Sequence, residues 1–148
     1  MEHVLGYELH RLLWFIDHKA NDRLRPHGLT YTQFRILRSI DTLSPVTGKD
    51  LAAFLMVTPS SMSKSVSRLI DEGFVVDTQM PGVGNIQRLE LTRRGRRILE
   101  PIAAEMDSAL DQIAAAAGVT TEELAESLRR MTEAFSQLQG KVEHPAAP

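Results

Sequence analysis

The sequence predicts a mainly α fold of about six helices with one small β-hairpin, and three observations predict it. Apolar residues recur at the spacing of amphipathic helices over most of the 148-residue chain. Only "FVVDTQ" and "IQRLEL" change to a strand-like pattern, and they flank the Pro/Gly-rich "MPGVGN". Threonines stand before several helical segments, where N-caps are expected.

The first helix is expected to stop near "RPHG" at residues 25–28. It carries a main apolar stripe of Leu5, Leu9, Leu13, Ile16 and Ala20. Tyr7, Trp14 and His18 form a second stripe, turned by about a third of a circle. A helix that is apolar on two sides needs two surfaces to pack against, and one of them could belong to another subunit.

Three helices and the hairpin follow. Thr30 begins the second helix through a capping box in "TYTQ", and Thr47 caps a short third helix, "GKDLAAFLM". Thr58-Pro59 begins the fourth, because proline suits the first helical position, and Gly73 ends it. This order, completed by the hairpin, predicts a winged helix-turn-helix over residues 30–97, with the fourth helix (59–72) as the recognition helix.

Two more helices are expected after the hairpin. Thr92 can cap a long helix to about Ala117, and Thr120 opens the last helix. The apolar residues of the last helix step by four and three, a seam that suits a partner helix: Leu124, Leu128, Met131, Phe135 and Leu138. Residues 1–29 and 98–140 are therefore expected to form a helical dimerisation region, and residues 141–148 a disordered tail.

The outward face of the fourth helix is the candidate DNA-binding surface. On a helical wheel it carries small hydroxyls and two cations, and its candidate contacts are Ser60, Ser61, Lys64, Ser65 and Arg68. Hydroxyls can bond phosphates or base edges, and Lys and Arg can reach phosphates or guanine. The alternative is a solvated helix that happens to be rich in serine.

Charge is distributed unevenly along a chain of net charge −2. Residues 25–97 carry eleven Lys/Arg against six Asp/Glu, a net +5, whereas residues 98–148 carry −6 and residues 1–24 carry −1. A basic middle favours an anionic partner, although chance segregation of surface charge gives the same pattern.

Several classes of function are not expected. The chain has no cysteine, which excludes a thiolate nucleophile and a Cys-based zinc site. His10 and His18 lie about 12 Å apart along one helix, so they cannot share a metal. No phosphate loop, carboxylate pair or Ser/His/Asp set stands out, so we expect neither an enzyme nor a cofactor. Without a secretory signal or an apolar run of about 18 residues, a cytoplasmic protein without membrane contact is expected.

The chain resembles the MarR family (multiple antibiotic resistance regulators) in "HGLTYTQFRIL" (27–37), "DLAAFLMVTPSSMSKSVSRLIDEGFV" (50–75) and "LELTRRG" (89–95). The resemblance implies an obligate homodimer joined by its first and last two helices. It implies recognition helices in successive major grooves of a pseudo-palindromic double-stranded operator, with the wing near the minor groove. It also implies repression relieved by a small aromatic or anionic effector.

The wing departs from the family pattern. The usual Asp-x-Arg positions are Val83 and Asn85 here, so the wing arginine is missing. The candidate DNA contacts of this region are Asn85, Arg88, Arg93 and Arg94. Arginines in a first helical turn face the positive end of the helix dipole, which an anionic partner would offset, although simple solvation is the alternative.

Two questions stay open at this point. Tyr7, His10, Trp14 and His18 could line an effector pocket or could pack in the subunit interface. The missing wing arginine leaves a second hypothesis, a winged-helix dimer that has lost DNA binding and acts as a protein–protein adaptor.

Overall fold

The computed structural model describes residues 4–79 and 86–139, and this part of the chain contains six α-helices and a two-stranded antiparallel sheet. The helices are α1 (Val4–Leu24), α2 (Tyr31–Leu43), α3 (Gly48–Phe54), α4 (Pro59–Asp71), α5 (Arg93–Ala116) and α6 (Thr121–Gln139). A 3₁₀ turn, Arg25–His27, follows α1. The order is that of the predicted winged helix-turn-helix with flanking helices.

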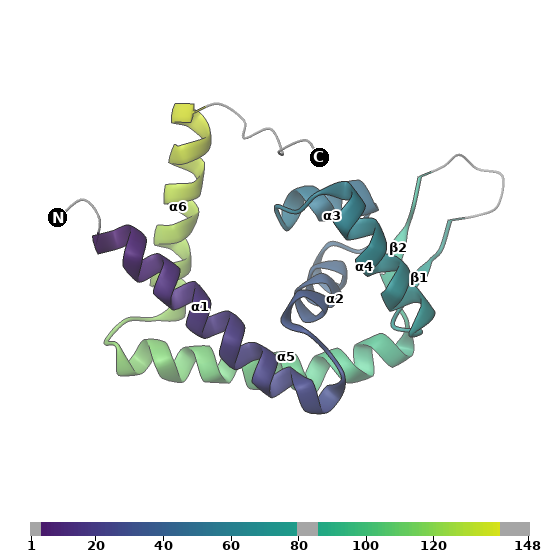
Figure 1. Cartoon of the computed structure of the whole chain (residues 1–148), viewed down its shortest axis with the longest axis horizontal. Coiled ribbons are helices and arrows are strands. Elements are labelled where there is room, and N and C mark those ends of the chain that lie inside the picture. The colour runs from purple at the N-terminus through teal and green to yellow at the C-terminus, as the bar shows by residue number, and fades with distance from the viewer. Residues whose placement is uncertain (1–3, 80–85, 140–148) are drawn as a thin grey trace.

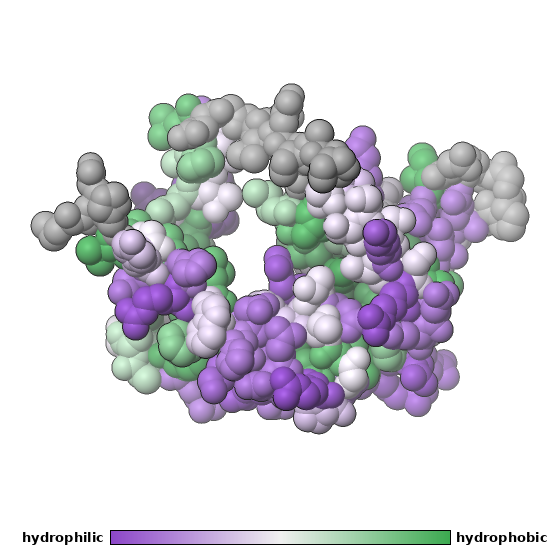
Figure 2. Space-filling view, viewed as in Figure 1, coloured by the Kyte–Doolittle hydropathy of each residue, from purple (hydrophilic) through white to green (hydrophobic). Residues whose placement is uncertain are grey.

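Figure 1 shows how these elements divide in space. Helices α2, α3 and α4 form a lobe with the sheet at one end of α5, and α6 rises from the other end. Helix α1 crosses α5 and reaches the lobe through its own C-terminal end, where Ala20 and Leu24 are buried. The space-filling view in Figure 2 shows an opening between the lobe and the free ends of α1 and α6.

Side-chain caps fix where the helices begin. Thr30 Oγ1 accepts the N–H of Gln33 at 3.2 Å, and Gln33 Oε1 accepts the N–H of Thr30 at 2.9 Å, which confirms the predicted capping box. The other predicted caps are confirmed by hydroxyls that accept an N–H three residues ahead, on Thr47, Thr58, Thr92 and Thr120. Gly73 ends α4 with a φ of 78°, in the left-handed region that favours glycine.

The hairpin strands are shorter than predicted. Strands β1 (Val75–Asp77) and β2 (Leu89–Leu91) pair over only three residues each. Beyond them one backbone bond continues the pairing, from the N–H of Thr78 to Arg88 O at 2.8 Å. Asp77 Oδ1 accepts the backbone N–H groups of Gln79 and Arg88, both at 3.0 Å. The predicted tip, "MPGVGN", and the predicted tail at residues 141–148 lie outside the described residues.

The hydrophobic core lies in the lobe and against α5. Its fully buried side chains include Leu24, Leu37, Ile40, Leu51, Leu69 and Leu89, each with 0% exposure. By contrast, none of the described side chains of α6 is buried, and the predicted seam from Leu124 to Leu138 is 39–85% exposed. Helix α1 likewise exposes Leu5 and Leu13, so α1 and α6 together present a large apolar surface.

Ion pairs join the lobe to α5. Arg38 on α2 donates both Nη groups to the carboxylate of Asp107 on α5, at 2.8 Å each. That hydrogen bond raises the pKa of Arg38 above its ordinary value. Asp41 and Arg96 form a second, looser link between the same helices at 3.4 Å.

Among the described helices, none combines the length and apolarity that a membrane crossing requires.

Candidate nucleic-acid interface

Three hydroxyl groups gather at the start of α4. Thr58 Oγ1 accepts the backbone N–H of Ser61 at 3.2 Å and donates to Ser61 Oγ at 3.0 Å. Ser60 Oγ lies 3.4 Å from the same Thr58 oxygen, and Pro59 occupies the first helical position. Some of the serines therefore belong to the cap of α4, at the positively polarised end of the helix, where hydroxyls are favoured.

Helix α4 has one buried and one exposed face, as predicted. Met62, Val66 and Leu69 are buried in the core of the lobe. The exposed residues of its outward face are Ser60, Ser61, Ser63, Lys64, Ser67 and Arg68. Ser65, on the flank of this face, is partly buried and lies toward α2. The face combines small hydroxyls with two cations, so a polyanion can approach it closely.

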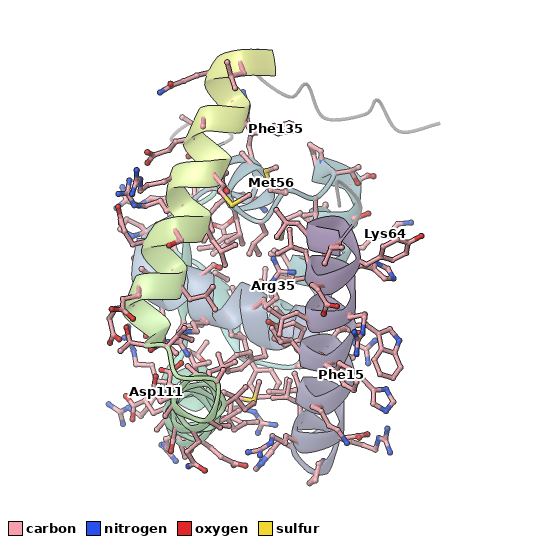
Figure 3. The ribbon with its side chains drawn as sticks, turned by 90° about the vertical axis from the view of Figure 1, so that its left-hand side faces the viewer. Phe15, Arg35, Met56, Lys64, Asp111 and Phe135 are labelled. Atoms are coloured by element: carbon pink, nitrogen blue, oxygen red, sulfur yellow. The ribbon has the colours of Figure 1, made fainter. Side chains whose placement is uncertain are left out.

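The two cations of this face have different surroundings. Lys64 points away from the body of the molecule in Figure 3, and no ion pair involves it within the described residues. Arg68 is 70% exposed at its side chain, and its Nε donates to Glu72 Oε1 at 3.1 Å. The Lys64 ammonium can therefore adjust its position to a phosphate, whereas the Nε of Arg68 is already bonded to Glu72.

Arginines also mark the first turn of α5. Arg93 is exposed, and Arg94 places its guanidinium over the ring of Phe74, 5.2 Å from the centroid. Arg94 therefore has a packing role that the sequence did not indicate, because Phe74 precedes it by twenty positions. This turn approaches the lobe closely at Gly95, where a Cβ atom would lie 2.2 Å from Phe74 O.

The wing contributes one described candidate. Arg88 is exposed, and its backbone N–H donates to Asp77 Oδ1 at the base of the hairpin. Asn85 lies outside the described residues. Whether the wing contacts DNA stays a prediction.

The four predicted effector residues lie on the outer side of α1. Tyr7 is 69% exposed and Trp14 54% exposed, and His10 is exposed as well. The indole of Trp14 stacks on the imidazole of His18, with 5.0 Å between ring centroids. The structure brings Trp14 and His18 together, but it places all four residues in the open rather than around a cavity of the single chain.

A small hollow lies instead between α2 and α4. It has a volume of about 50 Å³, and its wall is mostly apolar. It is lined by Thr32, Arg35, Ile36, Leu55, Val57, Ser61, Met62 and Ser65. Arg35 is exposed, and Figure 3 shows it on the side of α2 that faces the space beside α1 and α6. The hollow therefore has the side of α4 that faces α2 as one wall, and the cation of Arg35 as part of its lining.

Sequence reasoning missed Arg35 and Glu72. Glu72 stands four positions after Arg68, a spacing that predicts a helical ion pair, so this signal was present in the sequence. Arg35 gave no such signal, because its importance depends on Leu55 and Val57 folding back against α2.

The lobe of α2, α3 and α4 carries a two-stranded wing, and its α4 is exposed and rich in hydroxyls. This arrangement defines the winged helix-turn-helix class of transcription regulators. Residues 29–82 match the MarR family. The chain is 28% identical over 103 residues to the HTH-type transcriptional regulator YwoH of Bacillus subtilis (strain 168), over 69% of this chain and 74% of YwoH. Over these residues the chain is similar to the MarR family of winged-helix transcriptional regulators.

One further relative is similar in sequence, and two solved structures are similar in fold. An HTH-type regulator of Bacillus thuringiensis subsp. konkukian (strain 97-27) is 33% identical over 81 residues; the match covers 55% of this chain and spans about half, 53%, of that relative. The Mycobacterium tuberculosis MarR family protein Rv2887, in complex with salicylic acid, has a TM-score of 0.63 and 28% identity, covering 88% of this chain and 95% of that one. A mutant of Escherichia coli MarR, in complex with operator DNA, shares the fold, with a TM-score of 0.69 and 23% identity over 88% and 93% of the two chains.

Proposed function

We propose that this chain is a homodimeric DNA-binding repressor whose recognition helix, residues 59–72, enters the major groove, and that a small effector releases it. The observation that carries the proposal is the outward face of α4, where exposed hydroxyls surround Lys64 and Arg68. Acids are confined to the end of that helix, at Asp71 and Glu72. The complex of the E. coli MarR mutant with operator DNA supports the same use of a shared fold.

Dimerisation is proposed through residues 1–29 and 98–140, with residues 30–97 as the DNA-binding lobe. The support is the exposed apolar surface of α1 and α6, which a second copy would cover. In such a dimer the two recognition helices must lie roughly 34–36 Å apart to enter successive major grooves. A ligand that prefers a different spacing of the lobes weakens operator binding by shifting the population.

The hollow between α2 and α4 is the proposed effector site, for an aromatic carboxylate. Its wall is apolar and Arg35 stands beside it, which suits a ring and an anionic group. Rv2887, 28% identical, is bound to salicylic acid, a ligand of this class. A hollow of about 50 Å³ is smaller than such a ligand, so binding is expected to widen it, and α4 forms one of its walls. The outer residues of α1, from Tyr7 to His18, remain the second candidate.

Salt dependence tests the proposal. Affinity for duplex DNA should fall steeply with salt, and replacing both Lys64 and Arg68 by alanine should reduce the log–log slope by up to about 0.9 for each lost phosphate contact. Lys19→Ala, on exposed α1, removes a charge of the same sign away from the face and should leave the slope unchanged. Affinity without salt dependence would favour the adaptor hypothesis, and an unchanged slope in the double variant would exclude α4 as the DNA-binding helix.

A further inference from the structure

Resting on the proposed insertion of α4 into the major groove, we propose that Glu72 is a positioning residue that holds Arg68 for base recognition and limits binding to non-operator DNA. The proposal concerns sequence selectivity, the ratio of operator affinity to non-specific affinity. Glu72 itself need not touch a base.

The geometry of the Arg68–Glu72 pair leaves both Nη groups of the arginine free to bind a base. Glu72 Oε1 accepts only the Nε–H of Arg68, at 3.1 Å. Within the described residues, no other partner takes the two Nη groups, and the arginine side chain is 70% exposed. Guanine presents O6 and N7 in the major groove, and two parallel N–H groups of an arginine match them. Held at Nε, the guanidinium has fewer orientations to lose when it binds a base.

Stability gives no reason for an acid at this position. Glu72 is the C-cap of α4, where its negative charge faces the negative end of the helix dipole. Its Oε2 is buried, and within the described residues it has no hydrogen-bond partner, an unfavourable state for a carboxylate oxygen. The ion pair with an exposed arginine offsets little of this, because water screens it. A residue that opposes stability in two ways and holds one outward-facing cation is expected to act through that cation.

The carboxylate has opposite effects on the two modes of binding. Near DNA its charge repels phosphates, which lowers sequence-independent affinity. By orienting Arg68 it raises affinity for a site that offers guanine in the matching place. Both effects increase selectivity, so removal of Glu72 should make the protein bind unselected DNA at least as well and its operator less well.

The experiment compares variants on two duplexes: one selected by the wild-type protein from a random-sequence library, and one of the same composition in scrambled order. Glu72→Ala removes charge and acceptor together. Asp71→Ala is the matched control, because Asp71 is an exposed acid at the end of α4 that no described residue pairs with, and its removal changes the charge equally. Glu72→Gln keeps an oxygen acceptor for Arg68 without the charge.

We expect Arg68→Ala to lower the selected-to-scrambled affinity ratio roughly tenfold, the discrimination of one lost bidentate arginine contact, and Glu72→Ala to lower it by a part of that factor. The loss should concentrate at one base pair of the selected site, the same position at which Arg68→Ala loses discrimination. Asp71→Ala should raise both affinities alike, and Glu72→Gln should recover most of the ratio. A local effect at a single base pair distinguishes positioning from general damage to the fold.

The proposal is overturned if the wild-type protein and Arg68→Ala differ in selectivity while Glu72→Ala matches Asp71→Ala. It is also overturned if Arg68→Ala retains full selectivity. If the wild-type protein shows no salt-dependent binding to either duplex, the DNA-binding function fails first, and the role of Glu72 falls with it.

Discussion

The exposed seam of α6 predicts that Phe135→Ala weakens self-association. The Phe135 side chain is 53% exposed in the single chain, and Figure 3 shows it projecting from the upper part of α6. About half of a phenylalanine surface is roughly 100 Å², and at about 25 cal/mol per Å² its burial contributes about 2.5 kcal/mol. In a two-fold symmetric dimer the contribution occurs twice, about 5 kcal/mol, so the dissociation constant should rise by roughly a few thousandfold.

Sedimentation equilibrium over a range of protein concentrations measures this change. Gln137→Ala, on the opposite side of the same helix, is the control and should dimerise like the wild-type protein. Alanine is a good helix former, so the far-ultraviolet circular dichroism of both variants should stay unchanged. If Phe135→Ala dimerises as tightly as the control, the seam of α6 is not the subunit interface.

The remaining predictions concern contacts between the lobe and α5. Gly95→Ala should destabilise the fold by about 3 kcal/mol, because its Cβ would meet Phe74 O at 2.2 Å and force the backbones apart. Thermal unfolding checks this against Gly6→Ala, whose Cβ meets nothing within 4 Å and which should not lower the melting temperature; equal behaviour would refute the close approach. Asp107→Asn should cost about 1 kcal/mol or less, because both partners of its pair with Arg38 are about half exposed. That loss should shrink in 1 M salt, and a loss independent of salt would contradict an ionic contribution.

The raised pKa of Arg38 sets the pH range of that contribution. A cation whose pKa is higher in the folded state stabilises the fold at every pH below its unfolded pKa. The stabilisation is lost only as the pH rises through the folded value. The difference between Asp107→Asn and the wild-type protein should therefore not decline between neutral pH and pH 9 on account of Arg38.

Local signals made the fold predictable from the sequence. Thr30, Thr47, Thr58 and Thr92 cap the helices they precede, because a cap depends only on residues within one turn. The strand lengths were not predictable, because the carboxylate of Asp77 accepts the N–H of Arg88, which a β-pattern alone would assign to a backbone carbonyl.

The site was predictable only in part, because some of its contacts join residues that are distant in sequence. The outward face of α4 follows from helical periodicity, so the exposure of Lys64 and Arg68 could be read from spacing. The stacking of Arg94 on Phe74 and the pairing of Arg38 with Asp107 join residues that are distant in sequence, and no local pattern encodes them. The hollow beside Arg35 likewise exists only once α4 packs on α2.

Chemical protection of guanine N7 on a selected duplex tests the central claim most directly, because that atom lies in the major groove. Two copies of α4 in successive major grooves should protect two clusters of guanines centred roughly 10–10.5 base pairs apart on one face of the duplex. The double variant at Lys64 and Arg68 should lose both clusters together. A single protected cluster, or protection confined to adenine N3 in the minor groove, would contradict the account.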